Sequence, residues 1–260
     1  MTATHEVTAT HGGSADDRRV ALVHAADDYV GPALARLLAG RGHDLVIGDP
    51  APGLVEDLEA RGAAVEVVEG VGNPAQEGNS ERLVAAGLAR FGRLDAAAAF
   101  SGAIVVGRFL DSSLDDLRRV ERGCMEAPYL FLKAVVPHMV ERRAGQVLVI
   151  TSASAARPTP GAPLYSAARA GATHLVRNVA DEVARHGVQV NAIGTNFMDF
   201  PGFLAATGAT DPEVRARVEA QVPMRRLGGM EEFAAMCGVF LDGTSGFATG
   251  QYLSFAGGWA

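Results

Sequence analysis

The strongest constraint on the fold is the alternation of short apolar runs with longer amphipathic segments along the chain. Residues 20–23, 45–47 and 147–150 are typical of buried strands, and apolar side chains recur at helical spacing between such runs. Strands that alternate with helices favour a parallel sheet, because parallel strands need crossover connections. We therefore predict an α/β fold, a doubly wound parallel sheet of about seven strands with helices on both faces.

The chain shows no internal repeat and no linker that would divide it into two domains. Residues 1–18 are polar and are expected to form a flexible N-terminal tail, with residues 19–260 as a single domain. A long helix is predicted over residues 113–142, with a kink at Pro128. Ligands of such sheets bind beyond the carboxyl ends of the strands. The loops after the first, fourth, fifth and sixth strands are therefore expected to build the site.

Composition argues against several kinds of partner. The 260 residues include 23 basic and 30 acidic side chains, a net charge of −7, without a basic stripe, so no nucleic acid is expected. No apolar run approaches the ~20 residues of a membrane helix, and no signal peptide is recognisable. The two cysteines, Cys124 and Cys237, exclude a disulfide framework and favour the cytoplasm. No Cys/His cluster predicts a metal site.

Three polar side chains near the fifth predicted strand carry the candidate chemistry. The strand ends at Ser152, and Tyr165 and Arg169 lie one turn apart on the helix that follows. A phenol has a pKa of about 10 and is a poor base near neutral pH, but a neighbouring guanidinium favours its phenolate form. Tyr165 could then act as general base while Ser152 orients a substrate oxygen. The alternative is a surface tyrosine and a strand-end serine, which spacing alone favours.

Further segments accompany these three residues in a recognisable order. The strand reads Gln-Val-Leu-Val-Ile-Thr-Ser at 146–152, the helix reads Tyr-Ser-Ala-Ala-Arg at 165–169, and matching segments stand at 91–95, 188–193, 223–228 and 249–258. In this order the chain, from about Arg19 to Gly258, resembles the short-chain dehydrogenase/reductase superfamily. The resemblance implies a Rossmann-like domain, catalytic roles for Ser152, Tyr165 and Arg169, and a homotetramer.

The turn after the first strand departs from that superfamily's pattern. A member that binds a dinucleotide needs a glycine-rich turn, so that the backbone can approach the pyrophosphate. Here Ala25 and Tyr29 replace the first and middle glycines, and only Gly31 remains. Asp27 and Asp28 would repel phosphates. We therefore expect no cofactor.

A Ser-Tyr-Arg triad without a dinucleotide turn resembles the halohydrin (haloalcohol) dehalogenases, most closely those of the G type. The Gly-Thr-Asn-Phe segment at 194–197 resembles their halide loop, with Thr195 in place of a proline. The resemblance implies a cofactor-independent lyase that closes epoxides from vicinal halohydrins and releases halide and a proton. It also implies the reverse opening of epoxides by azide, cyanide or nitrite. The expected residues for the halide or other anion are Tyr29, Gly194, Thr195, Asn196 and Phe197.

Further residues are expected to line the substrate pocket. They are Gly107, Gly123, Met198, Phe200, Phe203 and Leu204. Glycine within a helix costs about 1 kcal/mol relative to alanine, so a need for space at Gly123 is one explanation, and a tolerated helix glycine is the other. Asp49, at the end of the second strand, fits either a ribose ligand or a turn.

Two other functions stay open beside the dehalogenase. The first is an NAD(P)H-dependent short-chain carbonyl reductase with a degraded glycine motif. The second is a catalytically silent protein that keeps only the fold, because a fold by itself does not fix a function. Binding of a nicotinamide cofactor would single out the first, and an activity lost on substitution of Tyr165 would exclude the second.

Overall fold

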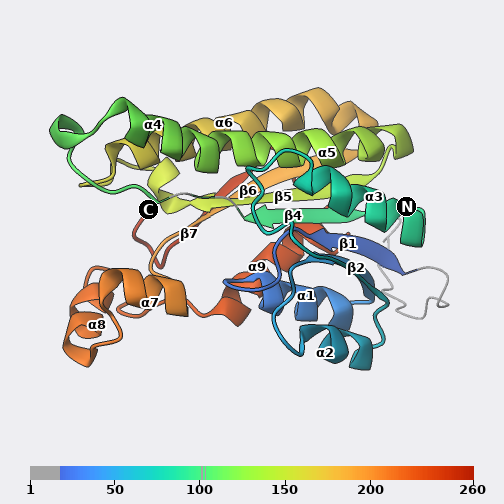
Figure 1. Cartoon of the computed structure of the whole chain (residues 1–260), viewed down its shortest axis with the longest axis horizontal. Coiled ribbons are helices and arrows are strands. Elements are labelled where there is room, and N and C mark those ends of the chain that lie inside the picture. Colours follow the sequence, from blue (N-terminus) through green and yellow to red (C-terminus); the bar gives the residue numbers. More distant parts are fainter. Residues whose placement is uncertain (1–17, 101, 103) are drawn as a thin grey trace, which may run out of the picture.

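A seven-stranded parallel sheet runs through the middle of the molecule (Figure 1). The computed structural model describes residues 18–100, 102 and 104–260. The strands follow the order β3-β2-β1-β4-β5-β6-β7, and neighbours are parallel throughout. They are β1 (Arg19–Val23), β2 (His43–Gly48), β3 (Val65–Val68), β4 (Ala96–Phe100), β5 (Gly145–Ser152), β6 (Val188–Thr195) and β7 (Tyr252–Phe255). This topology confirms the predicted α/β fold.

Helices cover both faces of the sheet (Figure 1). One face carries α3 (Asn79–Phe91), α4 (Leu114–Glu121), α5 (Ala127–Arg142) and α6 (Pro163–Val183). The other carries α1 (Gly31–Gly40), α2 (Leu54–Ala60) and α9 (Met230–Leu241). Two separate apolar clusters fill the spaces above and below the sheet. The alanines of β4 are buried, as expected for a strand with helices on both sides.

Shorter helices lie between these elements. They are the 3₁₀ turns η2 (Phe109–Asp111), η4 (Ala153–Ala155) and η5 (Ala184–His186), and the helices α7 (Pro201–Thr207) and α8 (Pro212–Glu219). Figure 1 places α7 and α8 together beyond one end of the sheet. Because α7 directly follows β6 and its loop, it stands at the end where ligands of such sheets bind.

The helix predicted over residues 113–142 is present, with an interruption. A π-helical segment, η3 (Arg122–Glu126), joins α4 to α5, and Pro128 stands in the first turn of α5. A proline in a first turn sacrifices no intrahelical hydrogen bond. The expected kink therefore takes the form of a π-helical turn just before Pro128. Such turns are frequent at functional sites, and Gly123 and Ala127 here line the main cavity.

Most of the predicted N-terminal tail lies outside the described residues. Its last residue, Arg18, donates one hydrogen bond to the carboxylate of Asp44 at 2.8 Å and another to the carbonyl of His43 at 2.9 Å. Arg18 is therefore tied to β2. Among the described helices, none is long and apolar enough to cross a membrane. The described residues also hold no group of three or more His, Cys, Asp or Glu side chains placed for a metal ion.

Two buried histidines make the fold sensitive to acid. His24 and His43 are almost completely buried, and burial lowers the pKa of each imidazole to about 4. The positive charge of Arg19, whose Nε lies 3.2 Å from His43 Nε2, adds to the effect at His43. In an unfolded chain both side chains titrate near pH 6.5, so the unfolded state binds more protons below that pH. The neutral imidazoles therefore contribute their full share to the free energy of unfolding above about pH 6.5. This contribution is lost as the pH falls towards 4.

We expect the free energy of unfolding to fall by about 3 kcal/mol for each of these histidines between neutral pH and pH 4. Denaturant titrations at a series of pH values measure this fall. In His24→Asn the free energy of unfolding should depend less steeply on pH. A free energy of unfolding that stays constant down to pH 4.5 contradicts this prediction.

Candidate active site

A large cavity, here called the main cavity, lies at the carboxyl ends of the strands. Its volume is about 730 Å³, and residues that follow β1, β4, β5 and β6 line it. The strand order reverses between β1 and β4, and clefts at such a point are the usual ligand sites of this architecture. The helices α6 and α7, the π-helical segment η3 and residues 72–75 after β3 supply further parts of the wall. The four loops that the sequence analysis selected therefore do line the cavity, and the loop after β3 was missed.

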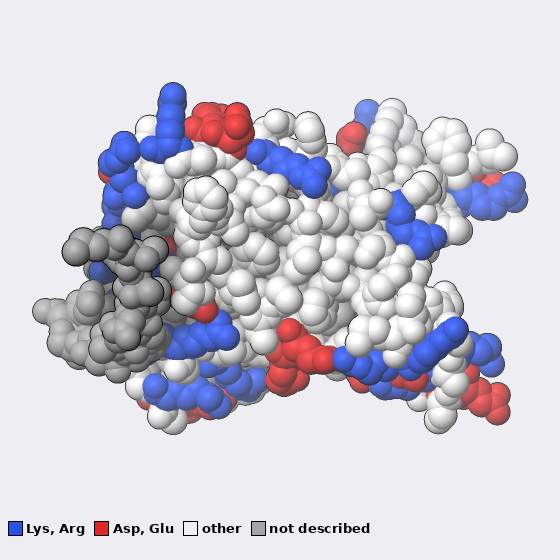
Figure 2. Space-filling view, turned by 180° about the vertical axis from the view of Figure 1, so that it is seen from behind, with Lys and Arg blue, Asp and Glu red and all other residues white. Residues whose placement is uncertain are grey.

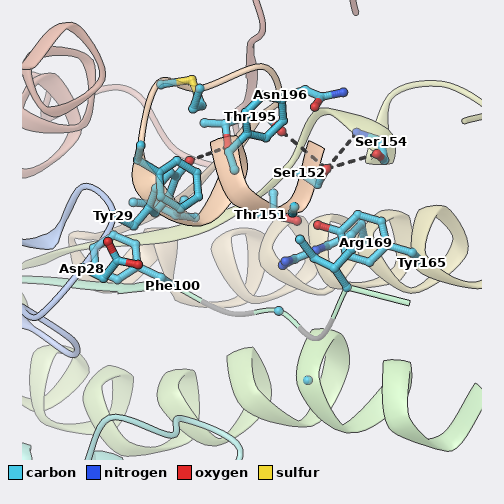
Figure 3. A pocket seen from close by; sticks show the side chains of 18 of the residues that line it. Asp28, Tyr29, Phe100, Thr151, Ser152, Ser154, Tyr165, Arg169, Thr195 and Asn196 are labelled. Carbon is cyan, nitrogen blue, oxygen red and sulfur yellow. Dashed lines mark hydrogen bonds between the residues drawn. The ribbon is translucent and has the colours of Figure 1, made fainter. Parts of the chain in front are cut away.

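The structure brings Ser152, Tyr165 and Arg169 to this one cavity (Figure 3). Ser152 ends β5, whereas Tyr165 and Arg169 project from the first turns of α6, and all three are buried. The guanidinium carbon of Arg169 lies 4.9 Å from the centroid of the Tyr165 ring, within the range of a cation–π interaction. Gly102 leaves room for this arrangement, because a Cβ there would overlap the guanidinium.

The hydroxyl of Ser152 belongs to a small network of hydrogen bonds. Ser152 Oγ donates to Ser154 Oγ at 3.1 Å and, more weakly, to the carbonyl of Thr195 at 3.4 Å. The N–H of Ser154 donates back to Ser152 Oγ at 3.2 Å. Thr151, beside it in the cavity wall, has a buried hydroxyl with no hydrogen-bond partner in the part of the chain that the structure describes. A bound substrate could satisfy that hydroxyl.

The segment after β6, which was expected to bind an anion, lies only partly at the cavity. Thr195, Asn196 and Phe197 line the cavity, but Gly194 is not among the described lining residues. Phe197 has a left-handed backbone, with φ 57°, and its N–H donates to the Asn196 side chain at 2.9 Å. The N–H of Phe197, one of the residues expected at the anion, therefore has an acceptor within the chain. Gly194 packs instead against the backbone of Ser152 on the neighbouring strand, which a Cβ at position 194 would overlap.

Tyr29 fills the part of the cavity next to the turn after β1. Its ring centroid lies 6.0 Å from that of Phe100, 4.7 Å from that of Phe200 and 5.7 Å from that of Phe233. Its Oη lies 2.5 Å from Thr195 Oγ1 (Figure 3). Burial raises the pKa of this phenol, so it stays protonated. The ring therefore links the turn after β1 to the end of β6.

The predicted pocket residues are only partly confirmed as neighbours of the cavity. Gly123, Met198, Phe200 and Phe203 line it. Gly107 borders a separate, smaller cavity beside Val105 and Pro163, and Leu204 packs on a cluster that contains Phe197 and Val218. Gly107 and Leu204 are therefore not among the described residues that line the main cavity.

Sequence reasoning missed two residues that contact Ser152. Ser154 shares hydrogen bonds with the Ser152 hydroxyl, and Tyr252 donates from Oη to the Ser152 carbonyl at 2.9 Å. A second hydroxyl two positions after the strand-end serine was a usable signal for Ser154. No local signal marks Tyr252, because it lies 100 residues further along the chain.

Comparison with known proteins places this geometry in a family. The family model described as enoyl-(acyl carrier protein) reductase matches residues 25–260. The chain belongs to the short-chain dehydrogenase/reductase superfamily. It is 30% identical to the 3-oxoacyl-[acyl-carrier-protein] reductase of Synechocystis sp. over 92% of this chain and 96% of that one. It is also 30% identical to the cis-4-hydroxycyclohexanecarboxylate dehydrogenase of Sinomonas cyclohexanicum, over 95% and 98%.

A solved structure agrees with this membership of the short-chain dehydrogenase/reductase superfamily. The crystal structure of levodione reductase superposes with a TM-score of 0.82 at 26% identity, over 92% of this chain and 96% of that chain. These relatives are reductases and a dehydrogenase, and nothing among them supports the cleavage of a carbon–halogen bond. The expectation of a halohydrin dehalogenase is therefore contradicted, and the reductase alternative is the one that the comparisons favour.

The superfamily implies a nicotinamide dinucleotide, which the turn after β1 does not fit. Tyr29 holds the left-handed conformation usual for glycine, with φ 55°, and its ring, packed on three phenylalanines, lines the cavity beside the turn. Asp27 and Asp28 are exposed beside it. These two carboxylates and Arg169 are the charged side chains among the described lining residues, so the pyrophosphate would meet negative charge.

Two further residues of this region, Gly31 and Asp49, have structural roles. A Cβ on Gly31 would overlap the carbonyl oxygen of Ala25, so glycine is kept where α1 packs closely on the turn. The Asp49 carboxylate accepts hydrogen bonds from the N–H groups of Gly70 at 2.7 Å and Val71 at 2.8 Å. Burial raises the pKa of Asp49, but these hydrogen bonds outweigh burial and hold the pKa below its usual value. Asp49 thus shapes a turn, and both its oxygens are engaged.

Proposed function

We propose that the protein is an oxidoreductase of the short-chain type that interconverts a carbonyl group and an alcohol on a small, mainly apolar molecule. The observation that carries the proposal is the meeting of Ser152 and Tyr165 at the main cavity, in a chain that matches its superfamily from residue 25 to 260. The names of the relatives, two reductases and a dehydrogenase, support the same class of reaction.

The described residues account for the proton transfer of such a reaction. The Ser152 hydroxyl donates a hydrogen bond to the substrate oxygen and orients it beside Tyr165. The phenol O–H of Tyr165 gives its proton to that oxygen during reduction and takes it back during oxidation. Arg169, stacked on the Tyr165 ring, stabilises the negative charge that then develops on the phenol oxygen. The superfamily resemblance implies NAD(P)H as the source of hydride, but because the turn around Tyr29 does not fit it, we assign no residue to that group.

The lining of the cavity indicates the kind of substrate. Ile104 and Val106, both more than 70% exposed, stand with Phe203 among its apolar neighbours, and Gly123 adds space in the opposite wall. The negative charge of the lining lies at the Asp27 and Asp28 end. A neutral ketone or secondary alcohol therefore suits this cavity better than a carboxylate does.

Self-association belongs to the same proposal. Figure 2 shows a face whose middle carries few charged side chains, with Lys, Arg, Asp and Glu gathered at its margins. Val239 in α9 and Phe247 between α9 and β7 are exposed apolar residues. Apolar surface of this kind supports the homotetramer that the superfamily resemblance implies. Light scattering coupled to size-exclusion chromatography tests it, and a monomer at micromolar concentration would contradict it.

The reaction is tested with a panel of cyclic and linear ketones and their alcohols, each with NADH, NADPH or the oxidised forms. We expect a change in the near-ultraviolet absorbance of the nicotinamide with at least one substrate. Ser152→Ala should lower kcat by about a hundredfold, because general acid–base sites contribute 10²–10⁴-fold. The exposed serine Ser113, outside the cavity, provides the control Ser113→Ala. A wild-type rate no higher than that of Ser152→Ala on every substrate contradicts the proposal.

A further inference from the structure

The backbone of Ser152 accepts a hydrogen bond from a tyrosine of another strand. Tyr252, the first residue of β7, donates a hydrogen bond from Oη to the backbone carbonyl of Ser152 at 2.9 Å. β6 lies between β7 and β5, so the phenol reaches across a whole strand to make this contact. Tyr252 is not among the described residues that line the cavity. Its contact is therefore with the backbone of Ser152 and not with a substrate.

Gly194 provides the space through which Tyr252 reaches Ser152. In the register of β5 and β6, Thr151 pairs with Gly194 and Ser152 pairs with Thr195. A Cβ on Gly194 would lie 2.6 Å from both the carbonyl carbon and the carbonyl oxygen of Ser152, and it would overlap the Tyr252 hydroxyl. Any larger residue at 194 would thus displace one partner of the hydrogen bond. The glycine that was expected to bind an anion instead makes this hydrogen bond possible.

The carbonyl that Tyr252 holds belongs to the peptide that leads into η4. The N–H of Ser154, one residue beyond that peptide, donates to Ser152 Oγ, and Ser152 Oγ donates to Ser154 Oγ. A rotation of the peptide after Ser152 would therefore move the N–H that holds the Ser152 hydroxyl. Burial raises the pKa of the Tyr252 phenol, so Tyr252 remains a hydrogen-bond donor at neutral pH.

We propose that Tyr252 is a positioning residue for Ser152: its hydrogen bond fixes the peptide after Ser152 and so aims the Ser152 hydroxyl at the substrate oxygen. The inference rests on the proposed function in one respect, namely that Ser152 acts on a substrate oxygen. It adds β7 to the elements that build the site, although no side chain of β7 is among the described lining residues.

A double-mutant cycle tests the proposal by activity. Tyr252→Phe keeps the ring and removes the hydroxyl, so we expect kcat to fall about tenfold while KM and Tm change little. In a Ser152→Ala background the same substitution should have almost no further effect, because the group that it positions is gone. Tyr129→Phe, at a half-exposed tyrosine of α5 outside the cavity, is the matched control. An equal fall of kcat in both backgrounds, or a fall that follows a loss of Tm, overturns the proposal.

Amide hydrogen exchange tests the proposal without any turnover. In Tyr252→Phe the N–H of Ser154 should exchange about tenfold faster, whereas amides of α5 should exchange at the wild-type rate. Unchanged exchange at Ser154 overturns the positioning role, whatever the activity. If exchange responds but the wild-type protein converts no carbonyl or alcohol, the positioning of Ser152 stands and the proposed reaction fails. The two failures are therefore distinguishable.

Discussion

Tyr165→Phe is expected to lower kcat about a thousandfold, the largest effect of any single substitution in this site. The phenol is the group that exchanges a proton with the substrate oxygen, and phenylalanine has no proton to exchange. The ring itself is buried against Arg169, and phenylalanine preserves that contact. Steady-state kinetics on the best ketone of the panel measures the fall, with thermal unfolding measured in parallel.

Tyr129→Phe is the matched control for Tyr165→Phe, since it removes the same atom from a tyrosine of α5. We expect the control to keep wild-type kcat and both variants to keep a wild-type Tm. If Tyr165→Phe retained more than a tenth of wild-type kcat, the proton would have to come from another group. The partnerless hydroxyl of Thr151 in the cavity wall would then be the first group to test.

Tyr29→Gly is expected to strengthen the binding of NAD(P)H at least tenfold. Glycine removes the ring that lines the cavity beside the turn, and it adopts φ 55° without strain. The variant also loses the ring contacts with Phe100, Phe200 and Phe233, so its free energy of unfolding should fall by about 3 kcal/mol. Calorimetric titration of wild type and variant with NADH and NADPH measures the gain and needs no substrate.

Tyr29→Phe separates the ring from its hydroxyl. It removes the hydrogen bond to Thr195 but keeps the ring in place, so dinucleotide binding should remain as weak as in the wild type. Wild-type protein that binds NAD(P)H with micromolar affinity, and loses affinity in Tyr29→Gly, would show that Tyr29 helps to hold the dinucleotide. That result would contradict the steric account of the turn.

The fold could be predicted because its signals are local, and the positions of the three residues of the triad followed from the same local signals. Apolar runs of the parallel strands stand out in the sequence, and the interval of four residues between Tyr165 and Arg169 places them on one helix face. The position of Ser152 at a strand end followed from the apolar run before it. Short-range periodicity is thus sufficient to predict the sheet, whereas the catalytic roles of the residues at its carboxyl edge followed only from the family resemblance.

Contacts between distant segments could not be predicted in the same way. Tyr29 packs on Phe233, 204 positions later, and Tyr252 reaches Ser152 from β7. Nor does the sequence reveal that the Asn196 side chain accepts the N–H of Phe197. The resemblance to dehalogenases rested mainly on two short loops, whereas similarity over residues 25–260 places the chain in the short-chain dehydrogenase/reductase superfamily.

The most direct test of the account is a product measurement with purified protein, one ketone and a stoichiometric amount of NADH or NADPH. Mass spectrometry counts the alcohol, and absorbance counts the oxidised dinucleotide. The account predicts that alcohol and oxidised dinucleotide form in equal amounts with wild-type protein and that neither forms with Tyr165→Phe. Absence of alcohol with every ketone, or a Tyr165-dependent conversion of substrate that leaves the dinucleotide unoxidised, would contradict it.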